Sequence, residues 1–529
     1  MRGRYLILTL AIAILVVIPQ TAFASGNSDS DQTSALAVLS KSRILPLGRL
    51  SGSAPDGTPF RRVDGTTGIG SIVLPRRTDP YQLPELAKQF PDSIVSSGDG
   101  VYLLNDDVIV GHGATLLIEG RTVHEVRLRS MPDHFITITA WRGAITVAGT
   151  EYQPVAITSW NPNENGPDLD EADGRAWVQT SRGTMDLTWA NTSYLGFATG
   201  TLSGVAWEGR PDEQVHGSVT YSNFLHNHFG AYTFEAAGMV CRYNTFAFNT
   251  GYGLDPHDHS NHFTVEYNRA FNNGTHGIIF SRGCDNNVIR FNASYDNGTH
   301  GIVLDDGPNV NPDGTLRERA GIPSNNNTVA QNTVYGNTIG IVLDGGTGNT
   351  ISGNVIRGNT YGIRMKDAVE QNTVTGNHFI DNTAFGIYLY NGSDRNVISG
   401  NSVSGGTSGV VIKDSAANQV DSNTLQGIGD RGIVFIGNVS GSVITNNEAA
   451  QVKMPLSLPD AAVSGPVTML GNSFDASRPS DTHPRSIHVP AIRWLVWALI
   501  LLFPVLLGSR IMRLFRSARA SWPIALRPK

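Results

Sequence analysis

The chain has 529 residues, and a single globular core rarely grows to this size, so the length predicts either several domains or one elongated architecture. Charged residues make up 16% of the chain and hydrophobic residues 40%, and the 58 glycines are typical of many short strands and turns. The formal net charge is −6, and no basic stripe alternates with aromatic residues, which argues against a nucleic-acid partner.

Both ends of the chain carry apolar segments. Arg2 and Arg4 precede an apolar run and a small-residue cleavage site at Ala22-Phe23-Ala24, so residues 1–24 are predicted to be a signal peptide. Residues 489–512 are apolar over about the length that a bilayer needs, which predicts a transmembrane helix. The arginine-rich tail 513–529 is then cytoplasmic by the positive-inside rule. We therefore expect an extracytoplasmic protein, periplasmic or at the cell surface, anchored by a single C-terminal span.

Between the termini, the composition changes from irregular to periodic. Residues 25–77 are rich in Ser, Gly and Asp without a sustained period, which predicts a flexible spacer. A short helix is expected at residues 84–90, and strands are expected at 114–118 and 134–139. We predict one repetitive domain over residues 78–480.

A glycine followed by an alternating apolar strand recurs along this domain. Successive glycines are 22 to 24 residues apart, except for one gap of 39 residues that contains an insertion at 309–325. This period is too short for a unit of helices and a strand, and it suffices for three short strands and three turns. The glycines of this column are Gly230, Gly253, Gly277, Gly301, Gly340, Gly362, Gly386, Gly409 and Gly432.

An asparagine column repeats in step with the glycines. Stacked asparagine amides can pass hydrogen bonds from one coil to the next, since each amide both donates and accepts. The sequence therefore predicts an all-β fold, a right-handed parallel β-helix with an asparagine ladder. The members of the column are Asn244, Asn268, Asn292, Asn332, Asn354, Asn377, Asn401, Asn423, Asn447 and Asn472.

The two cysteines, Cys241 and Cys284, occupy different columns about two coils apart. A disulfide is not expected at that separation, and two cysteines without ligand-like spacing do not indicate a metal site. We expect no metal ion and no cofactor.

Outward positions of the strand that follows each glycine place polar and aromatic side chains on one face. The first and third residues after the glycine are apolar and point inward, so the second and fourth point outward. These outward residues include Tyr232, His257, Asp305, Arg364 and Lys366. Aromatic faces stack on pyranose rings and cations meet carboxylates, so the strip suits an acidic polysaccharide.

One coil departs from the repeat. The segment from Tyr252 to Ser260 places Pro256 in a strand, where proline removes a ladder donor, and gathers Asp255, His257 and Asp258 around it. A local structural cost together with crowded titratable groups is typical of a functional site. A single histidine would more often be structural, but this cluster favours a catalytic role.

The Asp255-Pro256-His257-Asp258 element resembles the signature of mannuronan C5-epimerases, the alginate-modifying β-helix enzymes. Segments similar to their flanking coils are 123–128, 193–197, 235–236, 276–282 and 300–305, and the resemblance extends over about residues 113–411. The C-terminal span is not a feature associated with the periplasmic members. The calcium-binding repeats of the secreted members are also missing, which argues against a calcium requirement.

The resemblance implies a mechanism in which a proton is abstracted from C5 of the sugar. By position, His257 is expected to be the base and Arg282 the partner of the substrate carboxylate. Tyr252 could return the second proton, although water is an alternative. Asp255 and Asp258 are expected to orient His257 and set its tautomer, or to accept sugar hydroxyls. The other side chains expected to contact substrate are Asp258, His276, His300, Asp305, Arg364, Lys366, Tyr232 and Glu235.

The expected reaction is the conversion of β-D-mannuronate to α-L-guluronate residues in an alginate-like acidic polysaccharide. The expected partners are this polysaccharide, the membrane, and possible synthase or export proteins. A uronan lyase would share the first proton abstraction and then eliminate the 4-linked sugar. A non-catalytic polysaccharide-binding β-helix would not need His257 or Arg282. A copper-maturation protein should carry ligand sets rich in Met and His, and only 8 Met are present.

Overall fold

The computed structural model describes residues 57–63, 68–132, 134–198, 202–307, 321–460 and 465–475. The predicted signal peptide, transmembrane helix and basic tail, and most of the predicted spacer and of the insertion, lie outside these residues. Within the part of the chain that the structure describes, no helix is both long and apolar enough to cross a membrane.

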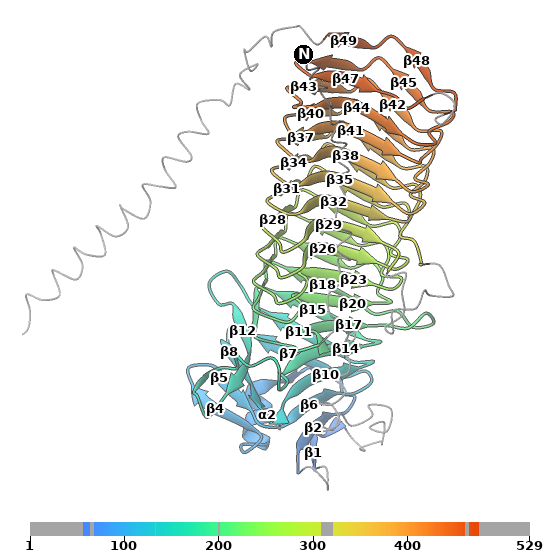
Figure 1. Cartoon of the computed structure of the whole chain (residues 1–529). Coiled ribbons are helices and arrows are strands. Elements are labelled where there is room, and N and C mark those ends of the chain that lie inside the picture. The colour runs from blue at the N-terminus through green and yellow to red at the C-terminus, as the bar shows by residue number, and fades with distance from the viewer. Residues whose placement is uncertain are drawn as a thin grey trace, which may run out of the picture. The chain divides into compact units, whose positions relative to one another are not determined.

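The described residues form a parallel β-helix built from three sheets (Figure 1). The only described α-helix, α2 (Leu83–Gln89), matches the short helix expected at 84–90. Strands pair in parallel from coil to coil, apart from four antiparallel pairs, β1–β2, β4–β5, β8–β9 and β12–β13. The predicted all-β solenoid is therefore confirmed.

The first sheet carries the strand that follows each column glycine, and its strands succeed one another along the stack (Figure 1). Its strands are β1 (Phe60–Val63), β2 (Gly70–Leu74), β6 (Asp107–Val110), β10 (Thr137–Trp141), β14 (Trp177–Ser181), β17 (Val205–Glu208), β20 (Ala231–Phe234), β23 (Leu254–His257), β26 (His276–Ser281), β29 (His300–Asp305), β32 (Ile339–Asp344), β35 (Tyr361–Lys366), β38 (Phe385–Tyr390), β41 (Ser408–Lys413), β44 (Arg431–Ile436) and β47 (Met454–Ser457). Because β1 and β2 belong to this sheet, the β-helix begins before the boundary at residue 78 that composition suggested.

The second and third sheets complete each coil. The second contains β3 (Tyr81–Gln82), β7 (Thr115–Glu119), β11 (Ala144–Ala148), β15 (Thr184–Thr188), β18 (His216–Thr220), β21 (Val240–Arg242), β24 (Thr264–Glu266), β27 (Val288–Arg290), β30 (Thr328–Ala330), β33 (Thr350–Ser352), β36 (Thr373–Thr375), β39 (Val397–Ser399), β42 (Gln419–Asp421), β45 (Val443–Thr445) and β48 (Thr468–Leu470). The third contains β4 (Ile94–Gly98), β5 (Val101–Leu104), β8 (Glu125–Met131), β9 (His134–Phe135), β12 (Val155–Asn161), β13 (Gly166–Pro167), β16 (Ala190–Ser193), β19 (Asn223–Leu225), β22 (Thr245–Ala247), β25 (Arg269–Phe271), β28 (Ala293–Tyr295), β31 (Thr333–Tyr335), β34 (Val355–Arg357), β37 (His378–Ile380), β40 (Ser402–Ser404), β43 (Thr424–Gln426), β46 (Glu448–Ala450) and β49 (Ser473–Asp475).

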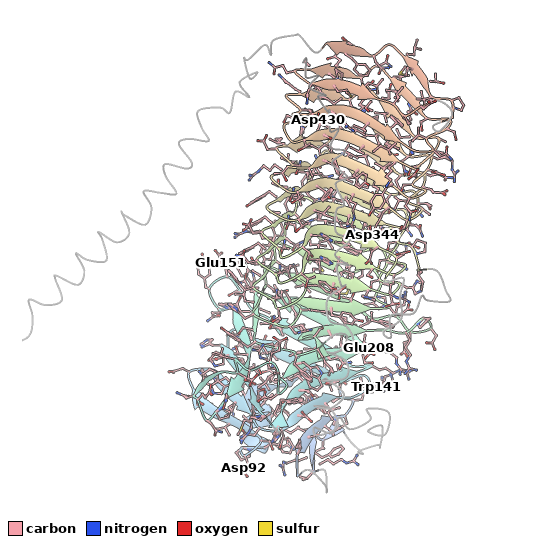
Figure 2. All side chains as sticks on the ribbon, viewed as in Figure 1. Asp92, Trp141, Glu151, Glu208, Asp344 and Asp430 are labelled. Carbon is pink, nitrogen blue, oxygen red and sulfur yellow. The ribbon has the colours of Figure 1, made fainter. Side chains whose placement is uncertain are left out.

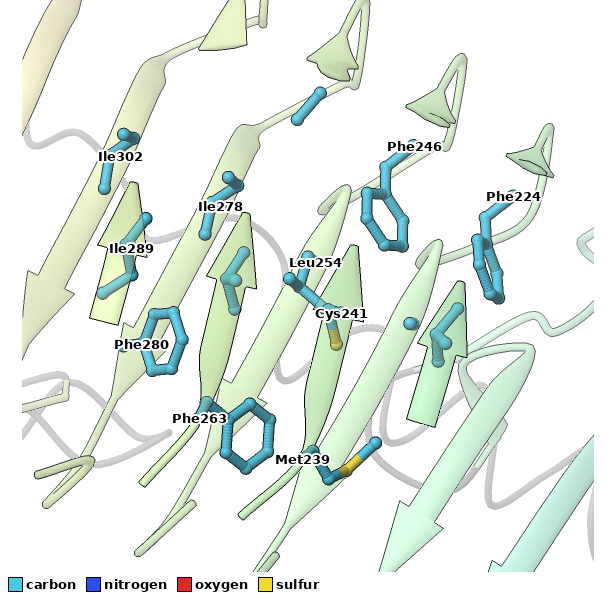
Figure 3. Close-up of a cluster of buried hydrophobic side chains, with 14 of the residues drawn as sticks. Phe224, Met239, Cys241, Phe246, Leu254, Phe263, Ile278, Phe280, Ile289 and Ile302 are labelled. Carbon is cyan, nitrogen blue, oxygen red and sulfur yellow. The ribbon is translucent and has the colours of Figure 1, made fainter. Parts of the chain in front are cut away.

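The core is a set of stacked apolar columns. Ile278, Ile302, Ile341 and Ile363 succeed one another in register and are completely buried. Around the middle coils the core also takes aromatic and sulfur-containing side chains, among them Cys241 (Figure 3). Both cysteines are buried and free. Gly253 is required for close approach, because a Cβ there would lie 2.4 Å from the carbonyl oxygen of Gly277.

The predicted asparagine column forms a continuous ladder. In it, Asn354 Nδ2 donates to Asn377 Oδ1 and to the Val329 carbonyl, each at 2.9 Å. Two further ladders, which we did not predict, run from Asn249 to Asn382 and from Asn287 to Asn418. The stacked turns therefore satisfy buried amides along the whole middle of the solenoid.

The ladder predicts a large cost for a small substitution. Asn354→Ala should lower the free energy of unfolding by about 3 kcal/mol, because several buried backbone and amide groups lose their partners at once. Thermal and denaturant unfolding of the full chain would measure this cost. The control Asn163→Ala removes an exposed asparagine and should change stability by less than about 0.5 kcal/mol. Equal effects of the two substitutions would contradict a stabilising ladder.

Candidate active site

The proline-containing coil interrupts the first sheet. Strand β23 pairs with β20 through all four of its residues, but with β26 only through Leu254↔Ile278 and His257↔Ser281. Pro256 cannot donate to the ladder, as the sequence predicted. Asp255 and His257 alternate with the inward Leu254 and so point to the outer face.

His257, Asp258 and Arg282 form a connected group on this face. The carboxylate of Asp258 accepts a hydrogen bond from His257 Nδ1 through Oδ2, and one from Arg282 Nε at 2.8 Å through Oδ1. Asp258 and Arg282 have positive φ angles of 35° and 65°, so both leave their strands in a left-handed turn. The turns are tied from coil to coil, because the Asp258 amide donates to the Ser281 carbonyl at 2.9 Å.

The charges within this group stabilise one another. Burial alone would raise the pKa of Asp258, but the hydrogen bonds from His257 and Arg282 lower it below its usual range. Burial alone would lower the pKa of His257, but the hydrogen bond to Asp258 and the nearby Asp255 raise it above 6.5. Because the ionised Asp258 accepts the Nδ1 proton, the neutral imidazole presents the lone pair of Nε2.

Two further aspartates lie close to His257 without a cation of their own. Burial raises the pKa of Asp255 to about 7 and that of Asp305 to about 6. In each carboxyl group, Oδ1 is buried without a hydrogen-bond partner among the described residues. His257, Ser281 and Asp305 occupy one outward column on successive strands. His257 and Asp305 therefore lie on either side of the small side chain of Ser281.

Tyr252 belongs to a stacked column at the start of the strands. Its ring centroid lies 4.6 Å from that of Phe229 and 5.0 Å from that of His276, which in turn stacks on His300 at 4.8 Å. Burial raises the pKa of Tyr252, so the phenol stays protonated at neutral pH. Burial lowers the pKa of His276, and burial together with Arg364 lowers that of His300 to about 3, so both imidazoles are neutral.

The outer face of the first sheet is apolar between these groups. Ile279, Val303 and Val342 stand at outward positions, yet each is at most 4% exposed, because Tyr252 and Tyr361 pack over them. These residues occupy the outward column that the repeat predicts, and the aromatic rings packed against them keep them from solvent.

The predicted site residues separate into three environments. His257, Asp258, Arg282, Asp255 and Tyr252 lie together on or beside β23. Two of the expected substrate contacts are largely buried: Tyr232 is 7% exposed within a cluster with Phe229, and Glu235 is 5% exposed beside Asp258 and His259. The other residues predicted to contact substrate lie on three later strands. These are His276 on β26, His300 and Asp305 on β29, and Arg364 and Lys366 on β35.

Some polar side chains at this face were not among the predicted site residues. Asp344 extends the column of His257, Ser281 and Asp305, and Figure 2 shows it together with Glu208 and Trp141 at different levels of the first sheet. Glu171, far earlier in the chain, accepts hydrogen bonds from His228 and from Thr250, the latter at 2.7 Å. Sequence spacing could have indicated Asp344, but nothing in the repeat indicates Glu171.

The described residues contain no cluster of three or more His, Cys, Asp or Glu side chains arranged as ligands of a metal ion.

The pairing of His257 with Asp258 predicts its titration. NMR titration of the full chain should give His257 a pKa above 6.5, and Asp258→Asn should lower it, because the neutral amide no longer stabilises the imidazolium. His378, exposed on β37, provides the internal reference in the same spectra. An unchanged His257 pKa in Asp258→Asn would contradict the assigned interaction.

Two protein-family models match separate parts of the chain. The model described as "Right handed beta helix region" matches residues 203–314. The model described as "Periplasmic copper-binding protein (NosD)" matches residues 307–451. Each match covers less than half of the chain, and together they follow the regular coils of the solenoid.

The curated relatives share one name. Mannuronan C5-epimerase AlgG of Azotobacter vinelandii is 26% identical over 284 residues, which are 48% of this chain and 51% of the relative. Mannuronan C5-epimerase of Pseudomonas putida is 30% identical over 225 residues, 39% of this chain and 41% of the relative. The chain thus spans about half the length, or less, of the curated relatives it matches.

The crystal structure of the periplasmic alginate epimerase AlgG superposes with a TM-score of 0.52 at 18% identity, covering 83% of this chain and 98% of that one. A mutant of that protein gives a TM-score of 0.56 at 20% identity, covering 82% and 98%. At this identity the superposition shows the fold alone. The sequence matches confirm the resemblance to mannuronan C5-epimerases that the Asp255–Asp258 element indicates.

Proposed function

We propose that this chain is a polysaccharide C5-epimerase that converts β-D-mannuronate to α-L-guluronate residues in an alginate-like polymer. The observation that carries the proposal is the connected group of His257, Asp258 and Arg282 on an outward face of the β-helix. Relatives named mannuronan C5-epimerase support the choice of reaction. The acidic sugar is the substrate class that this group would recognise.

The first step removes the proton from C5, next to the carboxylate of the sugar. His257 Nε2 takes this proton as the C5–H bond breaks, and the imidazolium that forms is stabilised by Asp258. Because Asp258 already engages Arg282 Nε, we assign the two Nη groups of Arg282 to the substrate carboxylate. That contact strengthens as negative charge moves onto the carboxylate oxygens.

The second step returns a proton to the opposite face of C5. Tyr252 approaches from the beginning of β23 and His257 from its end, so the two side chains flank the outer face from two sides. The protonated phenol donates its proton to C5. The phenolate then recovers a proton from solvent, and the His257 imidazolium releases the one it took, so both groups return to their starting states. Asp255 acts on both groups electrostatically, and because burial raises its pKa to about 7, it holds a proton near neutral pH.

We also place the enzyme outside the cytoplasm, anchored by residues 489–512 and close to the machinery that exports the polymer. The apolar termini and the periplasmic alginate epimerase of similar fold support this location.

Proton NMR of polymannuronate incubated with the full chain in deuterium oxide tests the reaction. We expect guluronate signals with deuterium at C5, and a loss of at least about a hundredfold in rate for His257→Ala, since general-base catalysis contributes that much. His378→Ala, an exposed histidine on another face, should keep the activity. Unsaturated chain ends would instead identify a lyase, and no reaction would refute the activity on polymannuronate.

Tyr252→Phe separates the two proton transfers. Without the phenol, His257 still removes the C5 proton, so deuterium should enter mannuronate residues while guluronate formation falls by about tenfold or more. The measured quantity is the ratio of deuterated mannuronate to guluronate. A ratio equal to that of the unsubstituted chain would assign the second transfer to water.

A further inference from the structure

The outer face of the first sheet changes character along the solenoid. From β20 to β32, no outward strand position carries Lys or Arg. The next two strands carry cations and aromatic rings, which we call the distal cluster. Its members are Tyr361, Arg364 and Lys366 on β35, with Tyr388 and Tyr390 on β38.

The cations of the distal cluster share one carboxylate. Arg364 Nη2 lies 3.0 Å from Asp344 Oδ2, and Lys366 Nζ lies 3.4 Å from the same oxygen and 3.0 Å from Asp367. Burial raises the pKa of Asp344 in spite of these two cations. The side chains of Arg364 and Lys366 are 17% and 26% exposed, which leaves part of each for contact with a second carboxylate.

The aromatic members stand next to these charges. The rings of Tyr388 and Tyr390 stack with centroids 4.6 Å apart, and Tyr361 lies 6.3 Å from Tyr388. Arg364 and Lys366 are among the charges that act on the phenol of Tyr390. Aromatic rings beside cations match a pyranose that carries a carboxylate.

The repeat itself does not demand these residues. In the two strands that follow β38, the same outward columns hold Val411 and Lys413, then Val434 and Ile436. Lys413 is a further cation in the column of Lys366, whereas aliphatic side chains occupy the other three of these positions. The clustering of aromatic and cationic residues on β35 and β38 calls for a reason other than folding.

Spacing along the sheet separates this cluster from the reaction centre. Strand β35 lies four coils beyond β23, and β38 five, which at the strand spacing corresponds to about 19 and 24 Å. A 1,4-linked pyranose advances by a length close to one strand spacing. A chain lying along the sheet would therefore place a sugar four to five units from the reacting one over the distal cluster.

We propose that the distal cluster is a second uronate-binding subsite on the same outer face, which makes the protein prefer long polyuronate chains over short ones. A tetramer held at His257 cannot reach it, whereas a decamer can occupy both regions at once. Binding of the remote sugar then adds to the affinity as an intramolecular event. The inference rests on the proposed function only in taking a polyuronate as the ligand.

Binding can be measured without turnover in the full chain carrying His257→Ala. Isothermal titration with mannuronate tetramer and decamer should show tighter binding of the decamer. A longer chain can also bind in more registers, so tighter binding of the decamer does not by itself demonstrate a second subsite. Arg364→Gln in the same background should reduce the ratio of decamer to tetramer affinity about tenfold, as expected for one charge-assisted hydrogen bond.

Two further variants keep the result interpretable. Arg395→Gln removes a cation of neighbouring coils from another face, where it pairs with Glu370, and should leave the ratio unchanged. Tyr390→Leu preserves an apolar side chain, and should lower the ratio in the same direction as Arg364→Gln even if the latter folds poorly. If neither Arg364→Gln nor Tyr390→Leu changed the ratio of decamer to tetramer affinity from its value in His257→Ala alone, the proposed subsite would be wrong.

Failure of the subsite and failure of the proposed function give different results. A chain that epimerises polymannuronate but shows no dependence of the affinity ratio on Arg364 or Tyr390 has the activity without the subsite. A chain without epimerase activity whose ratio falls in both variants has the subsite without the activity.

Discussion

Every functional feature of this molecule depends on the parallel ladder that fixes one coil above the next. Backbone pairing sets the coil spacing, and the buried asparagine amides hold the turns in register because each links two coils. Side chains far apart in sequence thereby become neighbours at fixed intervals. His257, Ser281 and Asp305 are adjacent for this reason alone.

The regular pairing of the coils is interrupted at the candidate site. Pro256 removes a ladder hydrogen bond, and β23 pairs with β26 through only two residue pairs. Buried carboxyl groups at Asp255 and Asp305 add a desolvation cost. The intact ladders in neighbouring coils stabilise the region enough to tolerate these costs, and the result is a set of groups that exchange protons near neutral pH.

A solenoid also suits a linear ligand. Because the outer columns of the first sheet run along the stack, they offer a polymer a series of positions at nearly equal intervals. Chemistry at β23 and recognition at β35 can then be separated along one surface, each carried by its own coils. A globular pocket would have to place both functions around a single sugar.

The sequence by itself determined the class of fold, because a period of 22 to 24 residues with a glycine and an asparagine column admits few architectures. It also located the coil of the candidate site, since Pro256 and its titratable neighbours contradict the local repeat. Periodicity assigns a residue to a column and a face, whereas the grouping of His257 with Arg282 came from the resemblance to mannuronan C5-epimerases.

Only the tertiary structure decided which of those side chains are accessible and what they contact. Tyr232 and Glu235 were expected to meet substrate and are largely buried, and Ile279 and Val303 lie beneath Tyr252 rather than in solvent. Glu171 joins His228 across a large sequence separation. These outcomes depend on the rotamers that bulky side chains adopt and on which neighbouring column each side chain then covers. The sequence period gives no information about rotamers.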